Sequence, residues 1–486
     1  MPQSIPRDTF PEPWYKLGFR TTPVIMHDKR PAKSRSSPNL FGTDGVRGTA
    51  NIHPMTAEIA LRLGQAAAHV FRRDESRHKI VIGKDTRLSG YMIENALVAG
   101  ITSMGVDALL IGPLPTPGVA YITRSLRADA GIVITASHNP FEDNGIKFFR
   151  NDGYKLDDDV ERRIEDLVSG TELDRCRATA QDVGKAFRID DALGRYVEFV
   201  KKAFPAGAEL EGMTIAIDAA NGAAYKATPC VLRELGAKIH VFNNTPNGLN
   251  INFGCGSTHP EEISRRVKET GADIGIAHDG DADRLMLCDE AGNIVDGDEV
   301  LAIAGTDCLA RNQLRHNTLV ATIMSNMGLD ECIGQWGGRV VRAKVGDRYV
   351  IDEMRRHGYN VGGEQSGHII FADYTTTGDG IISALQVLRT MIETGKPLGE
   401  LRRVMHRYPQ KQVNIIVRNR KPLEDLPRVQ AALRDAETRL AGAGRVLLRY
   451  SGTEPKIRLL LESRNGSGLD TLADRIASAI DEELGT

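Results

Sequence analysis

The sequence predicts an α/β protein in which three similar mixed α/β domains surround a central cleft, followed by a smaller C-terminal α+β domain. Apolar strands alternate with helical segments through most of the chain, and one strand–helix–strand unit recurs three times. The region from residue 406 onward follows a different pattern. Because 486 residues exceed what one hydrophobic core usually holds, several domains are expected.

The predicted boundaries divide the chain into an N-terminal extension and four domains. The extension is rich in proline and basic residues and has no sustained period, so we expect a mobile or draped segment. The segments are 1–39 for the extension and 40–190, 191–293, 294–405 and 406–486 for the domains.

The first repeat follows a helix whose apolar residues recur at helical spacing from Ile59 to Val70, with Thr56 as its N-cap. Its first strand is KIVIG, residues 79–83, and a helix follows around residues 93–99. A second strand then runs into the polar stretch TASHNP, residues 135–140.

The second and third repeats follow the same plan, and each ends in a polar loop after an apolar strand. The second runs from TIAIDAANG to ADIGIAHDGDADR, and the third from NTLVATIMSN to NVGGEQSGH. Strands that alternate with helices form parallel α/β units, and ligands bind such units at the C-terminal ends of the strands. The three polar loops are therefore the first candidates for a functional site.

The C-terminal region predicts one strand at QVNIIV, a helix near residues 428–440, strands at RVLLRY and KIRLLLE, and a last helix. The last helix has Leu472, Ala473, Ile476 and Ile480 on one face. This order is typical of a small α+β domain.

Charge and cysteine usage exclude several classes of protein. The formal net charge is −2, from 62 Lys and Arg against 64 Asp and Glu, so no general basic field predicts binding to nucleic acid or an acidic membrane. The six cysteines have no C-x-x-C spacing, which favours a reducing compartment over disulfides or a zinc site. No apolar run is long enough to span a membrane and no signal-peptide core is present, so we expect a cytoplasmic protein.

The stretch HDGDADR, residues 278–284, predicts a metal site. Asp279, Asp281 and Asp283 can converge on one hard cation such as Mg²⁺, which prefers oxygen ligands. An EF-hand is excluded because Arg284 occupies the position of its glycine and both flanks predict strands. A solvated acidic turn is the alternative.

The stretch RYSGTEPKIR, residues 449–458, has the composition of a phosphate-binding loop. It combines guanidinium groups, hydroxyls and a glycine N–H between two strands. A plain hairpin turn would use the same residues. The chain contains neither a Walker A motif nor a complete G-x-G-x-x-G, so nucleotide binding is unsupported.

Two further loops contain candidate functional residues. In GGEQSGH, Glu364 and Ser366 can bind neighbouring hydroxyls and His368 can meet a phosphate or reacting oxygen, although Ser366 could equally cap a helix. In TASHNP, Ser137 is not part of a G-x-S-x-G elbow, and a protease-like dyad with His138 is disfavoured.

A serine combined with three metal-binding carboxylates suggests phosphoryl chemistry at Ser137. We expect Lys147, ten residues further on, to reach the same site. Burial near Arg47 would lower its pKa and make it a general base, although a surface lysine after an Asn-Gly turn is the alternative.

These motifs, in this order, resemble the α-D-phosphohexomutase family over about residues 40–486. The resemblance is closest to the bacterial members that act on glucosamine phosphates, and it extends to FGTDGVRGTAN, DNGIKFF, GLNINFGCGSTHPE, MSNMGLD and AKVGDRYV. It implies an isomerase that interconverts glucosamine 6-phosphate and glucosamine 1-phosphate through a phosphoserine and a 1,6-bisphosphate. That reaction supplies amino-sugar and peptidoglycan precursor synthesis.

The resemblance also implies roles for individual residues. Ser137 would be the phosphoserine, and its phosphoryl oxygen would share one Mg²⁺ with the three aspartates. A catalytic trace of glucosamine or glucose 1,6-bisphosphate would act as activator, and a homodimer is among the assemblies that the resemblance allows. The reacting groups would be handled by Lys147, Arg47, His138, Arg284 and His368, and the substrate would be bound by Glu364, Gln365, Ser366, Arg449, Ser451, Gly452, Thr453 and Arg458.

Two other activities fit the same motifs. A phosphomannomutase or phosphoglucomutase would differ at one sugar substituent, which is a small discrimination. A metal-dependent sugar phosphatase could use the same serine, but a separate phosphate loop and a hydroxyl-binding loop favour retention of a bisphosphate.

Overall fold

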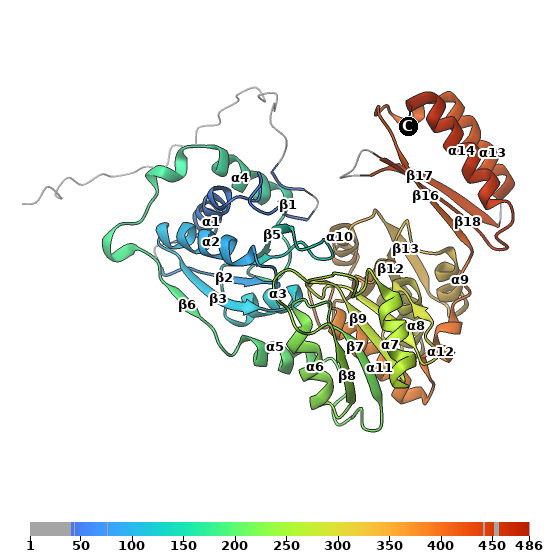
Figure 1. Ribbon diagram of the computed structural model, residues 1–486, viewed down its shortest axis with the longest axis horizontal. Helices are drawn as coiled ribbons and strands as arrows, with labels where there is room; N and C mark the ends of the chain where they lie inside the picture. Colours follow the sequence, from blue (N-terminus) through green and yellow to red (C-terminus); the bar gives the residue numbers. More distant parts are fainter. Residues whose placement is uncertain (1–39, 43, 75, 441–442, 452–455, 486) are drawn as a thin grey trace, which may run out of the picture. The chain divides into compact units, whose positions relative to one another are not determined.

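The computed structural model confirms the predicted α/β class (Figure 1). It describes residues 40–42, 44–74, 76–440, 443–451 and 456–485. All of these belong to a compact unit that begins at Leu40. The predicted extension, residues 1–39, lies outside the described residues.

The first sheet has the strand order β1-β5-β4-β2-β3-β6. Its strands are β1 (Val46–Thr49), β2 (Lys79–Lys84), β3 (Asp107–Pro113), β4 (Ala130–Ile134), β5 (Asp143–Arg150) and β6 (Ala186–Arg188). Its helices are α1 (Ala57–Phe71), α2 (Gly90–Ser103), α3 (Thr116–Ser125) and α4 (Asp158–Ser169). Thr56 caps α1 as predicted, because its hydroxyl accepts a hydrogen bond from the backbone N–H of Ile59 at 3.4 Å.

Side chains of β2 alternate between the two faces of this sheet. Ile80 and Ile82 belong to a hydrophobic cluster with residues of α1 and α2, whereas Val81 belongs to a cluster that includes α3. Both faces are therefore covered, which explains why KIVIG is apolar throughout.

The second sheet has the order β11-β10-β9-β7-β8, and the third has the order β13-β12-β14-β15. The second consists of β7 (Thr214–Asp218), β8 (Lys238–Phe242), β9 (Ile274–His278), β10 (Leu285–Asp289) and β11 (Ile294–Val295), with helices α5 (Ala192–Lys201), α6 (Ala224–Glu234) and α7 (Pro260–Thr270) nearby in sequence. The third consists of β12 (Thr318–Thr322), β13 (Arg339–Ala343), β14 (Val361–Gly363) and β15 (Ile369–Phe371), with α8 (Gly297–Ala310), α9 (Met327–Gln335), α10 (Asp347–His357), α11 (Gly380–Thr394) and α12 (Leu398–Leu401).

The three sheets share one local arrangement. In each, one strand (β2, β7 or β12) pairs in parallel with two neighbours. One of those neighbours (β4, β9 or β14) also pairs with the antiparallel strand that follows it in the chain. The connections are the serine loop (135–142, β4 to β5), the aspartate loop (279–284, β9 to β10) and the GGEQSGH loop (364–368, β14 to β15), which follows the two glycines at the end of β14. These connections are too short for a crossover, so the strand that follows each one must be antiparallel.

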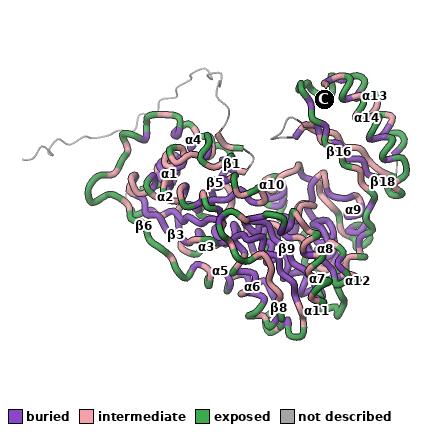
Figure 2. Tube along the Cα trace, viewed as in Figure 1, coloured by how far each residue is buried: buried purple, intermediate pink, exposed green. Residues whose placement is uncertain are grey.

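One hydrophobic core joins the three sheets, and the C-terminal region has its own. The shared core includes Val81 of the first sheet, Ile215 of the second and Leu319 of the third. Buried chain is concentrated around β3, β9 and α8 (Figure 2). A separate cluster contains Leu459 and Ile476 of the C-terminal region.

The C-terminal region is the predicted α+β structure. A three-stranded antiparallel sheet of order β16-β18-β17 pairs β16 (Gln410–Ile416), β18 (Lys456–Ser463) and β17 (Gly444–Tyr450), and helices α13 (Pro427–Leu440) and α14 (Leu469–Leu484) pack on it. Polar contacts attach it to the third sheet region: Asn326 and Tyr408 exchange two hydrogen bonds of 2.9 and 3.0 Å. Among the described residues, none of the helices combines the length and apolar character needed to cross a membrane.

Candidate active site

The serine loop holds Ser137 in a rigid, buried position. Ser137 has a φ of +51°, which a non-glycine residue adopts only when its surroundings hold it there. The buried Arg87 guanidinium donates hydrogen bonds to the carbonyl oxygens of Ser137 at 3.0 Å and Asn139 at 2.8 Å, and also to that of Pro140. Asn252, from the second sheet region, donates to the same Ser137 carbonyl at 2.8 Å.

The Ser137 hydroxyl faces the aspartate loop. It donates a hydrogen bond of 2.6 Å to an Oδ atom of Asp279, although the two residues are far apart in sequence. The Nδ1 atom of His138 lies 3.3 Å from the same hydroxyl. Burial, with the cations of Arg284 and Arg47, lowers the pKa of His138 to about 3, so its ring is neutral at neutral pH.

The three predicted metal ligands converge. Asp279, Asp281 and Asp283 each place a carboxylate oxygen within 4.8 Å of the others, and all three are buried. Burial and the two neighbouring carboxylates raise the pKa of Asp279 well above its ordinary value. One carboxylate oxygen of Asp281 and one of Asp283 are buried without a hydrogen-bond partner among the residues described. Clustered carboxylates with unused oxygens match the donor set that Mg²⁺ prefers.

The predicted low pKa of Lys147 is contradicted. Burial and the Arg47 cation lower the pKa of this lysine. Asp281, Asp44 and Asp283 surround it, and together they raise its pKa well above the ordinary value. Its Nζ atom lies 3.0 Å from Asp44 and 3.2 Å from Asp281. Three carboxylates outweigh desolvation and the Arg47 cation, so Lys147 is a buried cation here and does not have the low pKa of a general base.

The other predicted reacting groups border the same cluster. His368 Nε2 lies 3.9 Å from Asp283 and 3.5 Å from Asp347. The backbone N–H of Arg284 donates to Asp279 at 3.3 Å, and its side chain lies 4.0 Å from Asp283. Arg47 is partly exposed and pairs with Asp44 at 3.0 Å.

The GGEQSGH loop contributes polar groups next to this cluster. Glu364 accepts a hydrogen bond of 2.9 Å from the backbone N–H of Gly346. The Ser366 hydroxyl is buried and has no partner among the described residues, so the alternative role as a helix cap does not apply. Gln365 instead points to the C-terminal region, where its amide donates to Gln410 at 3.4 Å. Ligand binding by Glu364 and Ser366 stays a prediction.

The predicted phosphate loop is described in part. Arg449 of β17 and Arg458 of β18 are directly opposite each other in the sheet. Burial and the charge of Arg458 lower the pKa of Arg449, whereas the Glu364 carboxylate opposes that change, so Arg449 lies within electrostatic range of the GGEQSGH loop. Ser451 is buried and its N–H donates to the carbonyl of Lys456 at 2.8 Å. Gly452 and Thr453 lie outside the described residues.

Several residues near the site lie outside the sequence motifs described above. The Thr116 hydroxyl donates to Asp281 at 2.7 Å, and Lys155 pairs with both Asp44 and Asp347. A polar residue that follows a strand, as Thr116 follows β3, is a weak sequence signal for a residue of the site. Nothing in the sequence separates Lys155 from an ordinary surface lysine.

Together these side chains form a site for an anionic, hydroxyl-rich ligand. A buried hydroxyl contacts a carboxylate cluster suited to a hard cation, and a buried ammonium group lies beside that cluster. Arg449, which is opposite Arg458 in the sheet, lies within electrostatic range of Glu364, and the Ser366 hydroxyl of the same loop has no partner among the described residues. Phosphoryl transfer needs such a combination of a nucleophile, a cation site and groups that bind phosphate.

Comparison with protein-family models gives four consecutive matches. They are described as phosphoglucomutase/phosphomannomutase alpha/beta/alpha domain I over residues 38–175, domain II over 194–292, domain III over 296–408, and C-terminal domain over 413–479.

Similar proteins agree with these matches. A phosphoglucosamine mutase of Syntrophotalea carbinolica is 59% identical over 92% of this chain and 98% of its own length, and one of Myxococcus xanthus is 54% identical over 93% and 99%. A phosphoglucomutase/phosphomannomutase family protein of Burkholderia thailandensis has a TM-score of 0.75 at 24% identity, covering 91% of this chain and 97% of its own. An Aspergillus fumigatus N-acetylphosphoglucosamine mutase, solved with GlcNAc-6P and magnesium, has a TM-score of 0.63 at 19% identity, covering 92% and 96%. The two structural likenesses concern the fold alone.

Proposed function

The chain belongs to the phosphoglucomutase/phosphomannomutase family, and on that premise we propose that it interconverts glucosamine 6-phosphate and glucosamine 1-phosphate. The resemblance stated from the sequence motifs is thereby confirmed. The enzyme is an isomerase, and the net result of the proposed reaction is a change in which sugar oxygen carries the phosphate. Its product would feed amino-sugar and peptidoglycan precursor synthesis. The six cysteines are free thiols, which supports work in a reducing compartment such as the cytoplasm.

One observation carries this proposal: the Ser137 hydroxyl lies 2.6 Å from Asp279 inside the carboxylate cluster, with Lys147 beside it. A buried hydroxyl at that place can hold a phosphoryl group between a cation site and an ammonium group. Both positive charges would offset the negative charge that develops during transfer.

The cluster is suited to one Mg²⁺, held by Asp279, Asp281, Asp283 and a phosphoryl oxygen on Ser137. When bound, Mg²⁺ supplies Lewis-acid polarisation of the phosphoryl group. The unpartnered carboxylate oxygens and the raised pKa of Asp279 support this assignment, because a cation would relieve the repulsion among three buried carboxylates.

Other residues of the chain would stabilise charge and bind the substrate. Lys147 and Arg284 stabilise charge on the transferring group, and the neutral His138 ring, in the tautomer protonated at Nδ1, donates a hydrogen bond to the Ser137 oxygen. Glu364 and Ser366 bind ring hydroxyls. The non-reacting phosphate is bound by Arg449, Ser451, Gly452, Thr453 and Arg458.

The transfer balances without any further reactant. The bond between phosphorus and the Ser137 oxygen breaks, a bond between phosphorus and the free sugar hydroxyl forms, and the proton of that hydroxyl ends on Ser137. The resulting 1,6-bisphosphate turns around and returns its other phosphate to Ser137. A separate phosphate clamp and hydroxyl-binding loop permit both orientations, because neither has to distinguish the two ends of the sugar.

The test is turnover of glucosamine 6-phosphate, with and without a trace of glucose 1,6-bisphosphate, together with the intact mass of the enzyme. We expect the enzyme to carry one phosphoryl group on Ser137 after incubation with that bisphosphate. The first turnovers of the unphosphorylated enzyme should depend on the bisphosphate, and those of the phosphorylated enzyme should not. Ser137→Ala should abolish turnover and leave the melting temperature unchanged. Near-normal turnover in this variant would contradict the proposal.

The sugar preference is tested by kcat/KM for glucosamine, glucose and mannose phosphates. The names of the relatives favour glucosamine phosphates. Some use of glucose phosphates is expected, because the two sugars differ by one substituent. A higher kcat/KM for glucose or mannose phosphate would move the assignment to a phosphoglucomutase or phosphomannomutase.

A further inference from the structure

Lys155 lies between two parts of the active site that come from different sheets. Its Nζ atom contacts a carboxylate oxygen of Asp44, just before β1, and one of Asp347, at the start of α10. Its side chain is only 14% exposed. The ammonium group is therefore a largely shielded bridge between the first and third sheet regions.

Each of these carboxylates has a second partner at the reaction centre. Asp44 contacts Nζ of Lys147 at 3.0 Å, and Asp347 lies 3.5 Å from Nε2 of His368. Lys155 thus belongs to a charge series that runs from Lys147 through Asp44 and Lys155 to Asp347, and Asp347 in turn lies beside the His368 ring.

The segment next to Asp347 also contacts the GGEQSGH loop. The neighbouring residue, Gly346, donates its backbone N–H to Glu364 at 2.9 Å. Residues 346–347 therefore contact both the proposed ring-binding carboxylate, Glu364, and His368. A shift of this short segment would move both groups relative to Lys147.

We propose that Lys155 is a positioning residue that sets the GGEQSGH loop against Lys147 and Ser137 by bridging Asp44 and Asp347. This inference rests on the proposed mutase function for its catalytic consequence, but not for the existence of the bridge. Without Lys155, two partly buried carboxylates would lose their shared cation and repel each other. Groups that orient reacting residues in this way typically affect activity by about 10- to 100-fold.

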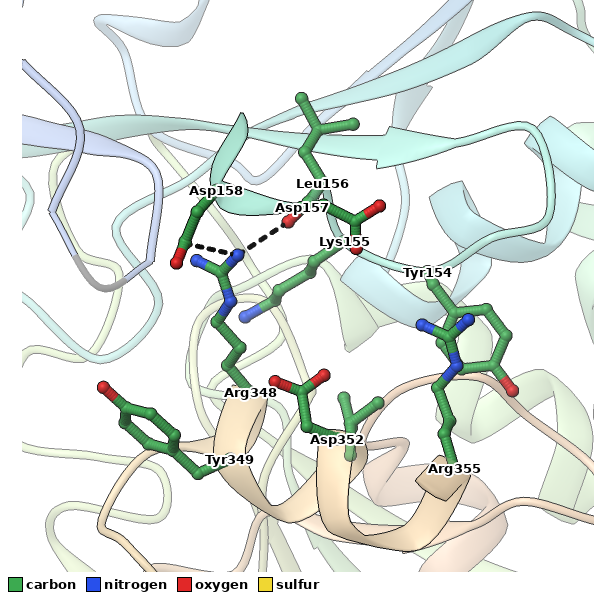
Figure 3. Close-up of a pocket in the computed structure, with 10 residues that line it drawn as sticks. Tyr154, Lys155, Leu156, Asp157, Asp158, Arg348, Tyr349, Asp352 and Arg355 are labelled. Atoms are coloured by element: carbon green, nitrogen blue, oxygen red, sulfur yellow. Dashed lines mark hydrogen bonds and ion pairs between the residues drawn. The ribbon is translucent and has the colours of Figure 1, made fainter. Parts of the chain in front are cut away.

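Arg348 provides a matched control at the next position of α10. It spans the same gap as Lys155: its guanidinium group donates to the backbone carbonyl of Leu156 at 3.1 Å and pairs with Asp158 at 2.6 Å (Figure 3). Figure 3 shows Arg348 reaching from α10 toward residues 156–158, with Lys155 beside it. The partners of Arg348 lie outside the charge series, so its loss should weaken the contact between the segments without disturbing Asp44 or Asp347.

The kinetic experiment compares Lys155→Met, Lys155→Arg and Arg348→Met, all with full-length enzyme and glucosamine 6-phosphate. We expect Lys155→Met to lower kcat by about 10- to 100-fold with KM changed less than about threefold. Lys155→Arg should recover most of kcat because it keeps the cation, and Arg348→Met should keep kcat within about twofold of the wild type. Equal losses of kcat in Lys155→Met and Arg348→Met, or no rescue by arginine, would overturn the positioning role.

A second experiment tests the bridge without any substrate. The melting temperatures of Lys155→Met, Asp347→Asn and the double variant form a double-mutant cycle. We expect the double variant to be more stable than the sum of the single effects predicts, since it removes the repulsion between Asp44 and Asp347. Additive effects would overturn the bridge itself. A further outcome is a wild type that does not turn over glucosamine 6-phosphate, combined with non-additive melting temperatures of the variants. That result would contradict the proposed function and support the ionic bridge between Asp44, Lys155 and Asp347.

Discussion

The buried ion pair between Arg87 and Asp85 determines the conformation of the serine loop. Both side chains are completely buried, and the guanidinium also donates to backbone carbonyls of that loop. Arginine suits this position because its planar group offers five donors in fixed directions. The positive φ of Ser137 is maintained by these contacts rather than by the preference of serine itself.

Arg87→Ala should destabilise the protein by about 3 to 5 kcal/mol, because it leaves the buried Asp85 carboxylate without its partner. Urea unfolding measures this change. The control is Arg195→Ala, which removes an exposed partner of Asp191 and should leave the stability nearly unchanged. A small effect of Arg87→Ala would show that the pair is dispensable for folding.

Asp279 and Asp283 of the metal cluster should oppose folding when no cation is bound, because burial and neighbouring carboxylates raise their pKa values. Asp281 differs: burial raises its pKa, but Lys147 and other partners outweigh burial and lower it to about 2. Asp279→Asn is therefore expected to leave the melting temperature of the metal-free protein unchanged or raise it, because the asparagine removes one of three repelling groups. Addition of Mg²⁺ should stabilise the wild type, by about 2.7 kcal/mol at a hundredfold excess over Kd, and have little effect on the variant. Thermal denaturation with and without chelator distinguishes these outcomes, and equal stabilisation of both proteins by Mg²⁺ would contradict the assignment.

At the scale of elements, helices α1 and α2 approach so closely that two glycines are required. A Cβ atom at Gly64 would lie 2.6 Å from the carbonyl oxygen of Leu97, and one at Gly100 would overlap with the carbonyl oxygen of Leu61. The obstacle is backbone in both cases, so no side chain can move aside. This contact fixes the helix pair that covers one face of the first sheet.

Gly100→Ala should therefore destabilise the protein, by about 1 to 3 kcal/mol as for other overpacked sites. The matched control is Gly334→Ala in helix α9, where a Cβ atom has open space. That substitution should be neutral or stabilising, because alanine favours a helix over glycine. Equal effects at the two positions would exclude close helix packing as the cause.

Sequence patterns predicted these elements well because burial leaves a local pattern in the sequence. The short continuous apolar run KIVIG corresponds to β2, which is covered on both faces, and the helical spacing from Ile59 to Val70 corresponds to α1. The sequence patterns did not predict that the strands after the three polar loops are antiparallel. That direction follows from the shortness of the loops and is seen in the strand pairing of the structure. The predicted domain boundaries remain a prediction.

At the scale of the whole molecule, the shared core contains a buried carboxyl group that links two sheet regions. Asp379 caps helix α11 and accepts a hydrogen bond of 2.8 Å from Tyr196 of α5. Burial raises the pKa of Asp379 from 3.8 to about 6, although its hydrogen bonds lower it. The folded protein therefore binds more protons than the unfolded chain between about pH 4 and pH 6, and this group destabilises the fold as the pH rises through that window.

Asp379→Asn should remove this pH dependence, since asparagine stays neutral and can still cap the helix. From pH 4 to pH 7 the free energy of unfolding of the variant should rise relative to the wild type by roughly 3 kcal/mol, from a pKa difference of about two units. Urea unfolding over this range measures the difference. Parallel profiles for the two proteins would contradict the raised pKa.

The sequence by itself determined the α/β class, the order of the repeats, the family resemblance and the identity of Ser137 and the three aspartates as candidates. Each of these depends on residues that are neighbours in the chain, where period, turn chemistry and spacing are visible. Only the tertiary structure decided the charge state of Lys147, and it revealed Lys155, Thr116 and Arg87 as neighbours of the site. Their environment consists of carboxylates and carbonyls from distant segments, and a pKa or a contact depends on distances that the linear order of residues does not contain.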